Sequence, residues 1–516
     1  MKSIRNITLG ISVIALFALP VATFAATTIT TDIATSTTWD ANGSPYIIKN
    51  SIEVVSGVNL TLNPGTIVQF DEGTGLNVSG SLVTGISSGK KTYITSLNDT
   101  TVIKKKKGDP ITTPSAGDYS GIVFNAGSTG TLKNVEIRYA DTAVNADDAT
   151  LSITNAAFVN NNNGVETHDG SLVLKSNKFS NNNTPVLVDY STTFTHDSNT
   201  FVNNGYNAIG VTGDMYGSNY RFTGDDASYV LFSNPSVASG NTLTIDNGVT
   251  ITGQASSDSI LVTGGTLNIG SAQANYRGRD DDHEDDEDEN NGVTLDGINI
   301  QAYNGAVVNI TGATIKNFGS TNAAVTVFNG STATIKNSII DNGGDGVVVF
   351  NDSTLDTDRV VIKNCSDGGI ITFGNEGYDD SVLKMRNSEL TANGFAIFPV
   401  DRTLVDVHNN SIHDNAIGVI NNGGLTYDFT KNWWGSVSGP YNATTNATST
   451  GDEVFDGITY APFLKYDPLS SRHDSDERGH GGHHDSDHDK DEVKHHAEDR
   501  VRSFIERGHD LEHRNR

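Results

Sequence analysis

Large apolar residues return along this 516-residue chain at a nearly constant interval, and we call these residues anchors. In the first half, Ile137, Phe158, Phe179 and Phe201 follow one another at intervals of about 21 to 22 residues. Later anchors keep this interval, except where surface insertions lengthen it: Ile315, Ile340, Ile362, Leu390, Ile412 and Trp434. Thr, Asn, Gly, Val and Ile are abundant between the anchors, which is typical of strands and turns.

The repeat length predicts the path of the backbone. A strand advances about 3.3 Å per residue, so one repeat traces a loop of roughly 70 Å with three short strands and three bends. A single turn cannot bury its apolar face, whereas stacked turns pair strand on strand and enclose a continuous core. Parallel crossovers are right-handed by default. The sequence therefore predicts an all-β right-handed parallel β-helix, a β-solenoid with about 21–22 residues per turn. A leucine-rich repeat is disfavoured because its leucine pattern and helical back are missing.

A coarser repeat divides the solenoid into two segments. The stretch that begins at Tyr46 matches the stretch that begins at Tyr229, and both copies later reach a charged loop. We therefore expect one segment over residues 45–215 and a second, with a terminal cap, over residues 226–467. Two arrangements stay open at this point, stacking of the segments end to end and two separate domains.

Two groups of short motifs carry a family resemblance. LTLNPGT at 60–66 with GDYSGI at 117–122 resembles bacterial and archaeal surface proteins with parallel β-helix repeats, in the broad pectin-lyase-like superfamily. NWWG at 432–435, SGPY at 438–441 and YAPFL at 460–464 resemble the closing turn of secreted β-helix proteins of the carbohydrate-binding and sugar-hydrolase type. The resemblance implies the fold over most of residues 45–467. It leaves function open, because the superfamily holds lyases, hydrolases, epimerases, adhesins and inert scaffolds.

The N-terminal stretch up to Ala25 has the parts of a secretory signal peptide. Lys2 and Arg5 precede an apolar run, and small residues at Thr23 and Ala25 suit a signal peptidase. We expect a signal peptide over residues 1–25, cleaved after Ala25, and a linker over residues 26–44. An uncleaved anchor is the alternative, although the run is short for a spanning helix. The sequence thus predicts an exported protein, which is secreted, periplasmic or on the cell surface, with no transmembrane span in the mature chain.

The charge and the cysteine content of the chain limit the kinds of partner and cross-link that it could have. A net charge of −28 argues against nucleic acid, which requires a basic surface, and suits binding of divalent cations. Cys365 is the single cysteine, so no intrachain disulfide forms, and we expect it to be a small core residue. The fold requires no cofactor. A polysaccharide or another cell-surface component is the expected partner, and the sequence predicts no particular oligomeric state.

Two segments outside the repeats offer metal ligands. From residue 470 the chain is rich in His and Asp, which indicates a disordered tail, and Val493, Ala497, Val501, Phe504 and Ile505 then follow the spacing of a short amphipathic helix. Loose binding of a transition metal is predicted for the tail histidines His483, His484, His488, His495 and His496. Weak binding of Ca²⁺, with a merely hydrated loop as the favoured alternative, is considered for Asp280, Asp281, Asp282, Asp285 and Asp286.

Polysaccharide cleavage on this fold requires a cationic base with calcium, or two or three carboxylates that converge. The candidate catalytic residues are Asp379 and Asp380, which lie in an insertion, with Arg386 and His408. Two further combinations are Asp341 with Asp345, and Asp414 with His408 and His413. Adjacent aspartates in a strand point to opposite faces, so solvated turn carboxylates are the favoured interpretation.

Basic residues recur four positions before several anchors, on the outward side of the predicted strands. A stripe that could follow an anionic glycan would consist of Lys133, Lys175, Lys336, Arg386 and His408. Chance occupation of exposed positions is the competing and favoured interpretation. Regular repeats and charge gathered in loops favour a non-catalytic scaffold that contacts glycan or another surface. The alternative is a lyase or hydrolase that acts on an acidic polysaccharide.

Overall fold

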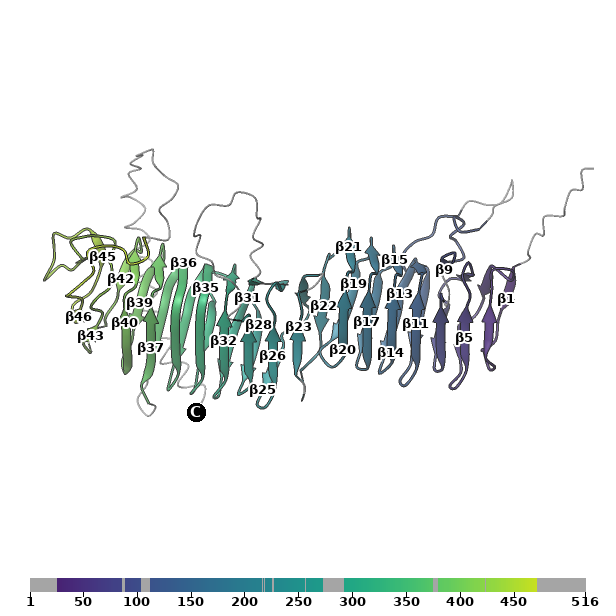
Figure 1. Cartoon of the computed structure of the whole chain (residues 1–516), viewed down its shortest axis with the longest axis horizontal. Coiled ribbons are helices and arrows are strands. Elements are labelled where there is room, and N and C mark those ends of the chain that lie inside the picture. Colours follow the sequence, from purple (N-terminus) through teal and green to yellow (C-terminus); the bar gives the residue numbers. More distant parts are fainter. Residues whose placement is uncertain are drawn as a thin grey trace, which may run out of the picture.

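A computed structural model describes residues 26–85, 89–103, 112–215, 217, 219–224, 227–255, 257–271, 292–374, 379–422 and 424–470. The chain forms one long rod in which strands follow each other along the axis in sequence order (Figure 1). The described part is an all-β parallel solenoid of about 16 turns and contains no α-helix. It therefore contains no helix that could span a membrane. The predicted right-handed β-helix is confirmed.

Three parallel sheets run along the first half, and we number the sides of the rod in the order in which each turn visits them. Side 1 consists of β1 (Thr27–Ile29), β3 (Tyr46–Ile48), β6 (Ile67–Phe70), β9 (Thr92–Ser96), β12 (Val135–Arg138), β15 (Ala157–Val159), β18 (Lys178–Ser180) and β21 (Thr200–Val202). Side 2 consists of β4 (Ile52–Val54), β7 (Gly75–Val78), β10 (Tyr119–Phe124), β13 (Ala140–Asp147), β16 (Asn163–His168), β19 (Thr184–Asp189) and β22 (Ile209–Thr212). Side 3 consists of β2 (Thr37–Trp39), β5 (Asn59–Leu62), β8 (Ser81–Thr84), β11 (Thr129–Lys133), β14 (Thr150–Thr154), β17 (Ser171–Lys175) and β20 (Thr193–Asp197).

The second half continues the same three sides. Side 1 continues through β23 (Tyr220–Phe222), β26 (Thr242–Ile245), β29 (Thr266–Ile269), β32 (Val307–Thr311), β37 (Ser381–Arg386) and β40 (Thr403–His408). Side 2 continues through β24 (Tyr229–Leu231), β27 (Thr250–Thr252), β30 (Val293–Asp296), β33 (Ala313–Lys316), β38 (Glu389–Thr391) and β41 (Ser411–His413). Side 3 continues through β25 (Ser236–Ala238), β28 (Asp258–Thr263), β31 (Ile298–Tyr303), β34 (Ala323–Val327), β39 (Phe395–Pro399) and β42 (Ile417–Val419). β35 (Thr332–Phe350) and β36 (Thr354–Phe373) each cover all three sides of one turn.

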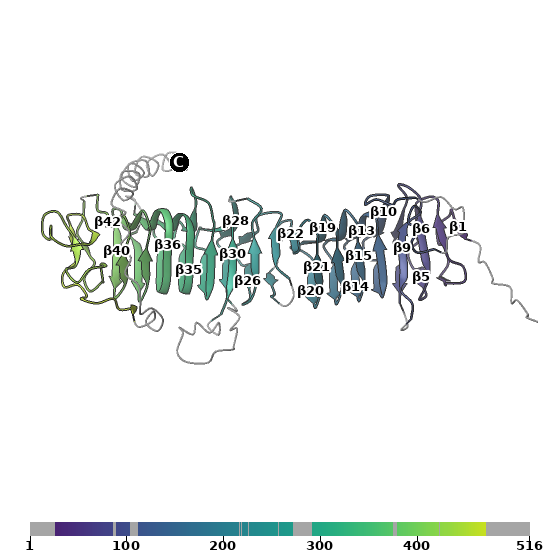
Figure 2. The ribbon, with the colours of Figure 1, turned by 90° about the horizontal axis from the view of Figure 1, so that it is seen from above.

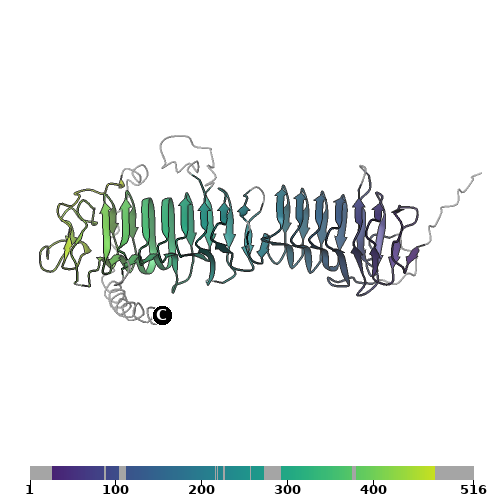
Figure 3. The same ribbon diagram turned by 90° about the horizontal axis from the view of Figure 1, so that it is seen from below.

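The two halves are stacked end to end, with a rotation of one side between them. β22 pairs directly with β24, so side 2 crosses the boundary without a gap. In the first half the anchors, such as Phe179, lie on side 1, whereas in the second half those such as Ile315 lie on side 2. The turn between Ile209 and Tyr229 has no regular strand on side 3, where Met215 fills the core instead. The views from above and below show the two halves in line (Figures 2 and 3).

Stacked side chains fill the interior. Phe158, Phe179 and Phe201 form a ladder with ring centroids 4.9 and 5.2 Å apart, which matches the spacing of adjacent strands. Asparagines three residues before many anchors, such as Asn155 and Asn337, adopt a left-handed backbone at the corners, a conformation that Asn tolerates better than most residues. Cys365 is buried, as expected, and burial raises the pKa of its thiol.

Both ends of the rod differ from a bare turn. Residues 26–44 were predicted as a linker, but they contain β1 and β2, which pair with β3 and β5. Trp39 of β2 is buried in the core, and its ring stacks on Tyr46 with centroids 4.6 Å apart.

At the C-terminal end, two short sheets are formed by β43 (Tyr427–Asp428) with β46 (Ile458–Thr459) and by β44 (Pro440–Tyr441) with β45 (Gly451–Glu453). Trp434 is fully buried there, and Phe463 packs against the core. The predicted signal peptide and tail helix lie outside the described residues.

Candidate functional site

The residues proposed from sequence for catalysis separate into two unconnected pairings on side 1. Asp380 accepts a hydrogen bond from Nε of Arg402 at 3.1 Å, at the start of β37 and β40, while Asp379 is exposed. At the far end of the same strands, Nη2 of Arg386 donates to Asp406 at 2.7 Å. Six strand residues, roughly 20 Å, separate the two ends. His408 lies beside Arg386 but hydrogen-bonds through Nδ1 with the carbonyl oxygen of Thr430, at 2.7 Å.

The predicted cationic stripe does not exist as one track. Lys133 and Lys175 lie on side 3, whereas Lys336, Arg386 and His408 lie on side 1, because of the rotation between the halves. Acidic residues also occupy the equivalent position in intervening turns. Lys175 faces Asp197 at 2.9 Å, and Asp358 stands in register between Lys336 and Arg386. Each column thus holds a carboxylate directly beside a cation of the neighbouring turn, which lowers the positive potential that an anionic glycan would require.

The proposed metal ligands lie outside the described residues, both the acidic residues 280–286 and the histidines of the tail. Within the part of the chain that the structure describes, no group of three or more His, Cys, Asp and Glu side chains is arranged to hold a metal ion. Binding of Ca²⁺ or of a transition metal thus stays a prediction for those two segments.

The last turns of side 2 bring acidic residues around one histidine. His413 on β41 hydrogen-bonds through Nδ1 with Asp414 at 2.7 Å and through Nε2 with Glu389 on β38 at 3.1 Å. These two hydrogen bonds raise the pKa of His413 to about 10, against the opposing effect of burial, so the ring is cationic at neutral pH. The sequence placed Asp414 with His413 and His408, but His408 lies on side 1 and takes no part.

Asp452 lies beneath this cluster and ends a ladder of buried asparagines. The backbone N–H and Nδ2 of Asn393 donate to Oδ1 of Asn415 at 3.0 and 2.9 Å. Asn415 repeats the pattern one turn later, with Nδ2 of Asn415 donating to Oδ2 of Asp452 at 2.8 Å. Burial raises the pKa of Asp452 to about 6, with a smaller contribution from Asp414, although the Asn415 hydrogen bonds and His413 oppose the shift. Asp452 thus supplies the acceptor that terminates the ladder.

This arrangement predicts a pH-dependent effect of Asp452→Asn. Because the folded-state pKa of Asp452 exceeds its ordinary value, its stabilising contribution is complete at acid pH and declines as the pH rises through about 6. An asparagine keeps the acceptor without a charge. We expect the variant to be more stable than the parent chain by roughly 1–2 kcal/mol at pH 7 and not at pH 4. Denaturant unfolding at both pH values checks this, and an equal difference at the two pH values would contradict it.

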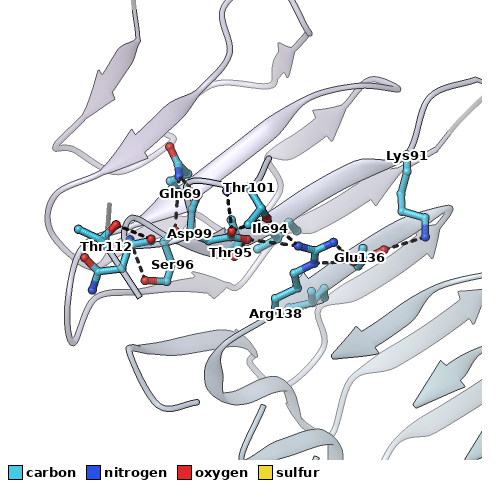
Figure 4. A network of polar contacts seen from close by, with 12 residues as sticks. Gln69, Lys91, Ile94, Thr95, Ser96, Asp99, Thr101, Thr112, Glu136 and Arg138 are labelled. Carbon is cyan, nitrogen blue, oxygen red and sulfur yellow. Dashed lines mark hydrogen bonds and ion pairs between the residues drawn. The ribbon is translucent and has the colours of Figure 1, made fainter. Parts of the chain in front are cut away.

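A second polar network lies on side 1 of the first half (Figure 4). Arg138 lies between Glu136, to which it donates, and Asp99, whose Oδ2 is 3.4 Å from Nη1 of Arg138. Asp99 is fully buried and also accepts hydrogen bonds from Thr95 and Thr101. These contacts join residues up to 39 positions apart. They were not predicted from the sequence. The network holds residues 99–101, at the start of the insertion after β9, against β12.

An aromatic pair stands on the outside of the rod near the junction of the two halves. Tyr206 and Phe232, 38% and 37% exposed, meet edge to face with centroids 5.5 Å apart. The ring of Phe232 lies over Gly210, where an added Cβ would come within 2.8 Å of it. The hydroxyl of Tyr206 donates to Oε1 of Gln254 at 3.2 Å. The pair therefore presents two fixed ring surfaces beside a polar amide. This pair was not predicted from the sequence.

A comparison with known protein families supports this architecture. Residues 289–434 match the family model "Right handed beta helix region". The matched residues and the stacked strands of the described part agree on a right-handed β-helix fold. No curated protein matches the chain. Among solved structures, the chain is similar to the catalytic domain of a GH87 alpha-1,3-glucanase, once in complex with tetrasaccharides and once with nigerose. Identities are 14% and 13%, with 74% and 73% of this chain covered and TM-scores of 0.19 and 0.15. The β-helix spans 64% of those domains, and neither similarity bears on its activity.

Proposed function

We propose that this β-helix is an exported, non-catalytic scaffold that contacts glycan at the cell surface or outside the cell. The observation that carries the proposal is the pairing of outward charges between adjacent turns. Arg386 with Asp406, Arg402 with Asp380, Lys175 with Asp197, and Lys316 with Asp296 are each 2.7 to 3.4 Å apart. A polysaccharide-cleaving site of this fold would instead need two or three carboxylates, or a cationic base with calcium, that converge on one spot. The export of the chain rests on the N-terminal sequence alone.

The aromatic pair is the surface that we assign to glycan. Aromatic faces pack against the C–H faces of sugar rings, and a neighbouring amide can hydrogen-bond a sugar hydroxyl. Tyr206 and Phe232 are held in place by Gln254 and Gly210, so little side-chain entropy would be lost on binding.

A glycan array followed by titration with the best ligand tests the proposal. We expect binding, and we expect Tyr206→Ala or Phe232→Ala to weaken it by about tenfold, which corresponds to ~1.4 kcal/mol. Tyr466→Ala removes an exposed tyrosine elsewhere and should have no effect. Affinity that is unchanged in both variants would place the glycan elsewhere.

The alternative function is polysaccharide cleavage, and the cluster around His413 favours it. Asp452, with a pKa of about 6, could donate a proton near neutral pH, and Asp414 is a neighbouring exposed carboxylate. Incubation with uronate polymers and neutral glycans, with calcium present, should be read for unsaturated products and reducing ends. Turnover that is lost in Asp414→Asn and Asp452→Asn, but kept in the exposed Asp401→Asn, would replace the scaffold proposal.

A further inference from the structure

A second apolar cluster lies on the outer surface of side 3, toward the C-terminal end of the rod. Strand residues alternate in direction, so the neighbours of core-facing Val347, Ile370 and Val419 point outward. Those outward neighbours are themselves apolar. The cluster, which we call the outer patch, consists of Val348, Ile371, Phe373, Phe395, Phe398, Val400, Ile417 and Ile420. It follows β35, β36, β39 and β42, which are adjacent along the rod (Figure 1).

The outer patch is covered. Ile371, Phe398 and Val348 are 0%, 1% and 4% exposed, although they face away from the core. Val173 occupies an outward strand position on side 3 of the first half and is 38% exposed. Its neighbours in register are Ser152 and Thr195, so an outward valine beside small polar residues stays partly open, whereas Val348 lies beside Ile371. Among described hydrophobic residues outside these strands, Phe455 packs on the patch at one edge.

We propose that residues 493–505 form an amphipathic helix that docks on the outer patch. The apolar residues Val493, Ala497, Val501, Phe504 and Ile505 fall on one stripe of a helix. From first to last they span thirteen residues, and the twelve rises of about 1.5 Å between them give about 18 Å of helix. The patch with its flanking Ala323 covers five turns, and four steps of about 4.8 Å give roughly 19 Å.

The connection to the tail permits this docking. The described chain ends at Ser470, at the same end of the rod as the patch. Residues 471–492 could extend over as much as about 70 Å, far more than the patch itself spans. If no segment covered the patch, it would be a contiguous apolar surface that promotes aggregation. The short amphipathic helix that the sequence predicts in the tail is thereby assigned a place on the solenoid.

Thiol labelling in the full chain tests the proposal. In a Cys365→Ala background, Val348→Cys reports on the patch, and Val173→Cys reports on an open position of the same side. Phe504→Asp with Ile505→Asp adds charge to the apolar stripe, and Ser503→Asp adds charge off it. We expect Val348→Cys to react at least about tenfold faster with the double aspartate than with Ser503→Asp, because docking protects it. The rate at Val173→Cys should stay constant in both.

Slow labelling at Val348→Cys in the double aspartate variant would overturn the proposal. If the labelling rate then rose when the protein was diluted, a second copy of the chain would be what buries the outer patch. Fast labelling in every variant would also overturn it, because the patch would then be open. A change at Val173→Cys would mean that the solenoid itself had been disturbed, and single Val501→Asp would take the place of the double variant.

Discussion

Replacing Trp434 by alanine is expected to lower the stability of the C-terminal turns by about 3–5 kcal/mol. Trp434 is completely buried and is the largest fully buried side chain of the described residues. Its indole lies under the end of the core, 3.3 Å from the place of a Cβ on Gly418. Its carbonyl oxygen accepts the N–H of Asp452 at 3.0 Å. Loss of the ring leaves a cavity at the end of the core.

Denaturant unfolding combined with hydrogen exchange measures this effect. A solenoid frays from its ends when an end turn is weakened, so β38, β41 and β45 should lose protection before the first half unfolds. Trp433→Ala is the matched control, because Trp433 is only partly buried and should cost much less. Equal losses in the two variants would show that Trp434 does not close the core.

The fold was predictable because a solenoid repeats its chemistry in every turn. The spacing of Phe158, Phe179 and Phe201 alone fixes the turn length, and their stacked rings confirm it. The rotation at the junction was not predictable in the same way. It depends on one turn between Ile209 and Tyr229 in which Met215 replaces a strand, and a single irregular turn leaves no periodic signal.

The candidate site was harder to predict, since function depends on columns of side chains across turns. The cationic stripe was predicted from its basic residues alone. Asp197 and Asp358 occupy the same columns and offset the charge of the neighbouring basic residues. The Arg138 network joins residues on both sides of an insertion, so no local pattern reveals it. The outer patch, in contrast, is indicated by a pattern in the sequence. Val347 to Phe350 is apolar without alternation, which indicates a strand covered on both faces.

Asn182→Ala is expected to destabilise the first half of the rod by about 3–5 kcal/mol, because it breaks a buried hydrogen-bonded ladder. Nδ2 of Asn182 donates to the carbonyl oxygen of Phe158 and to Oδ1 of Asn204, both at 3.0 Å. Its Oδ1 accepts from the backbone N–H and Nδ2 of Asn161 at 3.1 and 3.0 Å. Alanine removes the hydrogen bonds that the Asn182 side chain makes with Phe158, Asn204 and Asn161, although Oδ1 of Asn204 still accepts the backbone N–H of residue 182. Each buried group left short of a partner costs about 1–3 kcal/mol.

Asn183→Ala provides the control one residue away. Its side chain points to solvent and donates one longer hydrogen bond, to Asn162 at 3.3 Å, so we expect a change within about 0.5 kcal/mol. Denaturant unfolding followed by circular dichroism compares the two variants. Turns on both sides of Asn182 depend on it, so the loss should move the main transition and not only the fraying of an end. If the two variants shifted the midpoint equally, the polar ladder would not contribute to stability, and the apolar stacking of Phe158 and its neighbours would account for it alone.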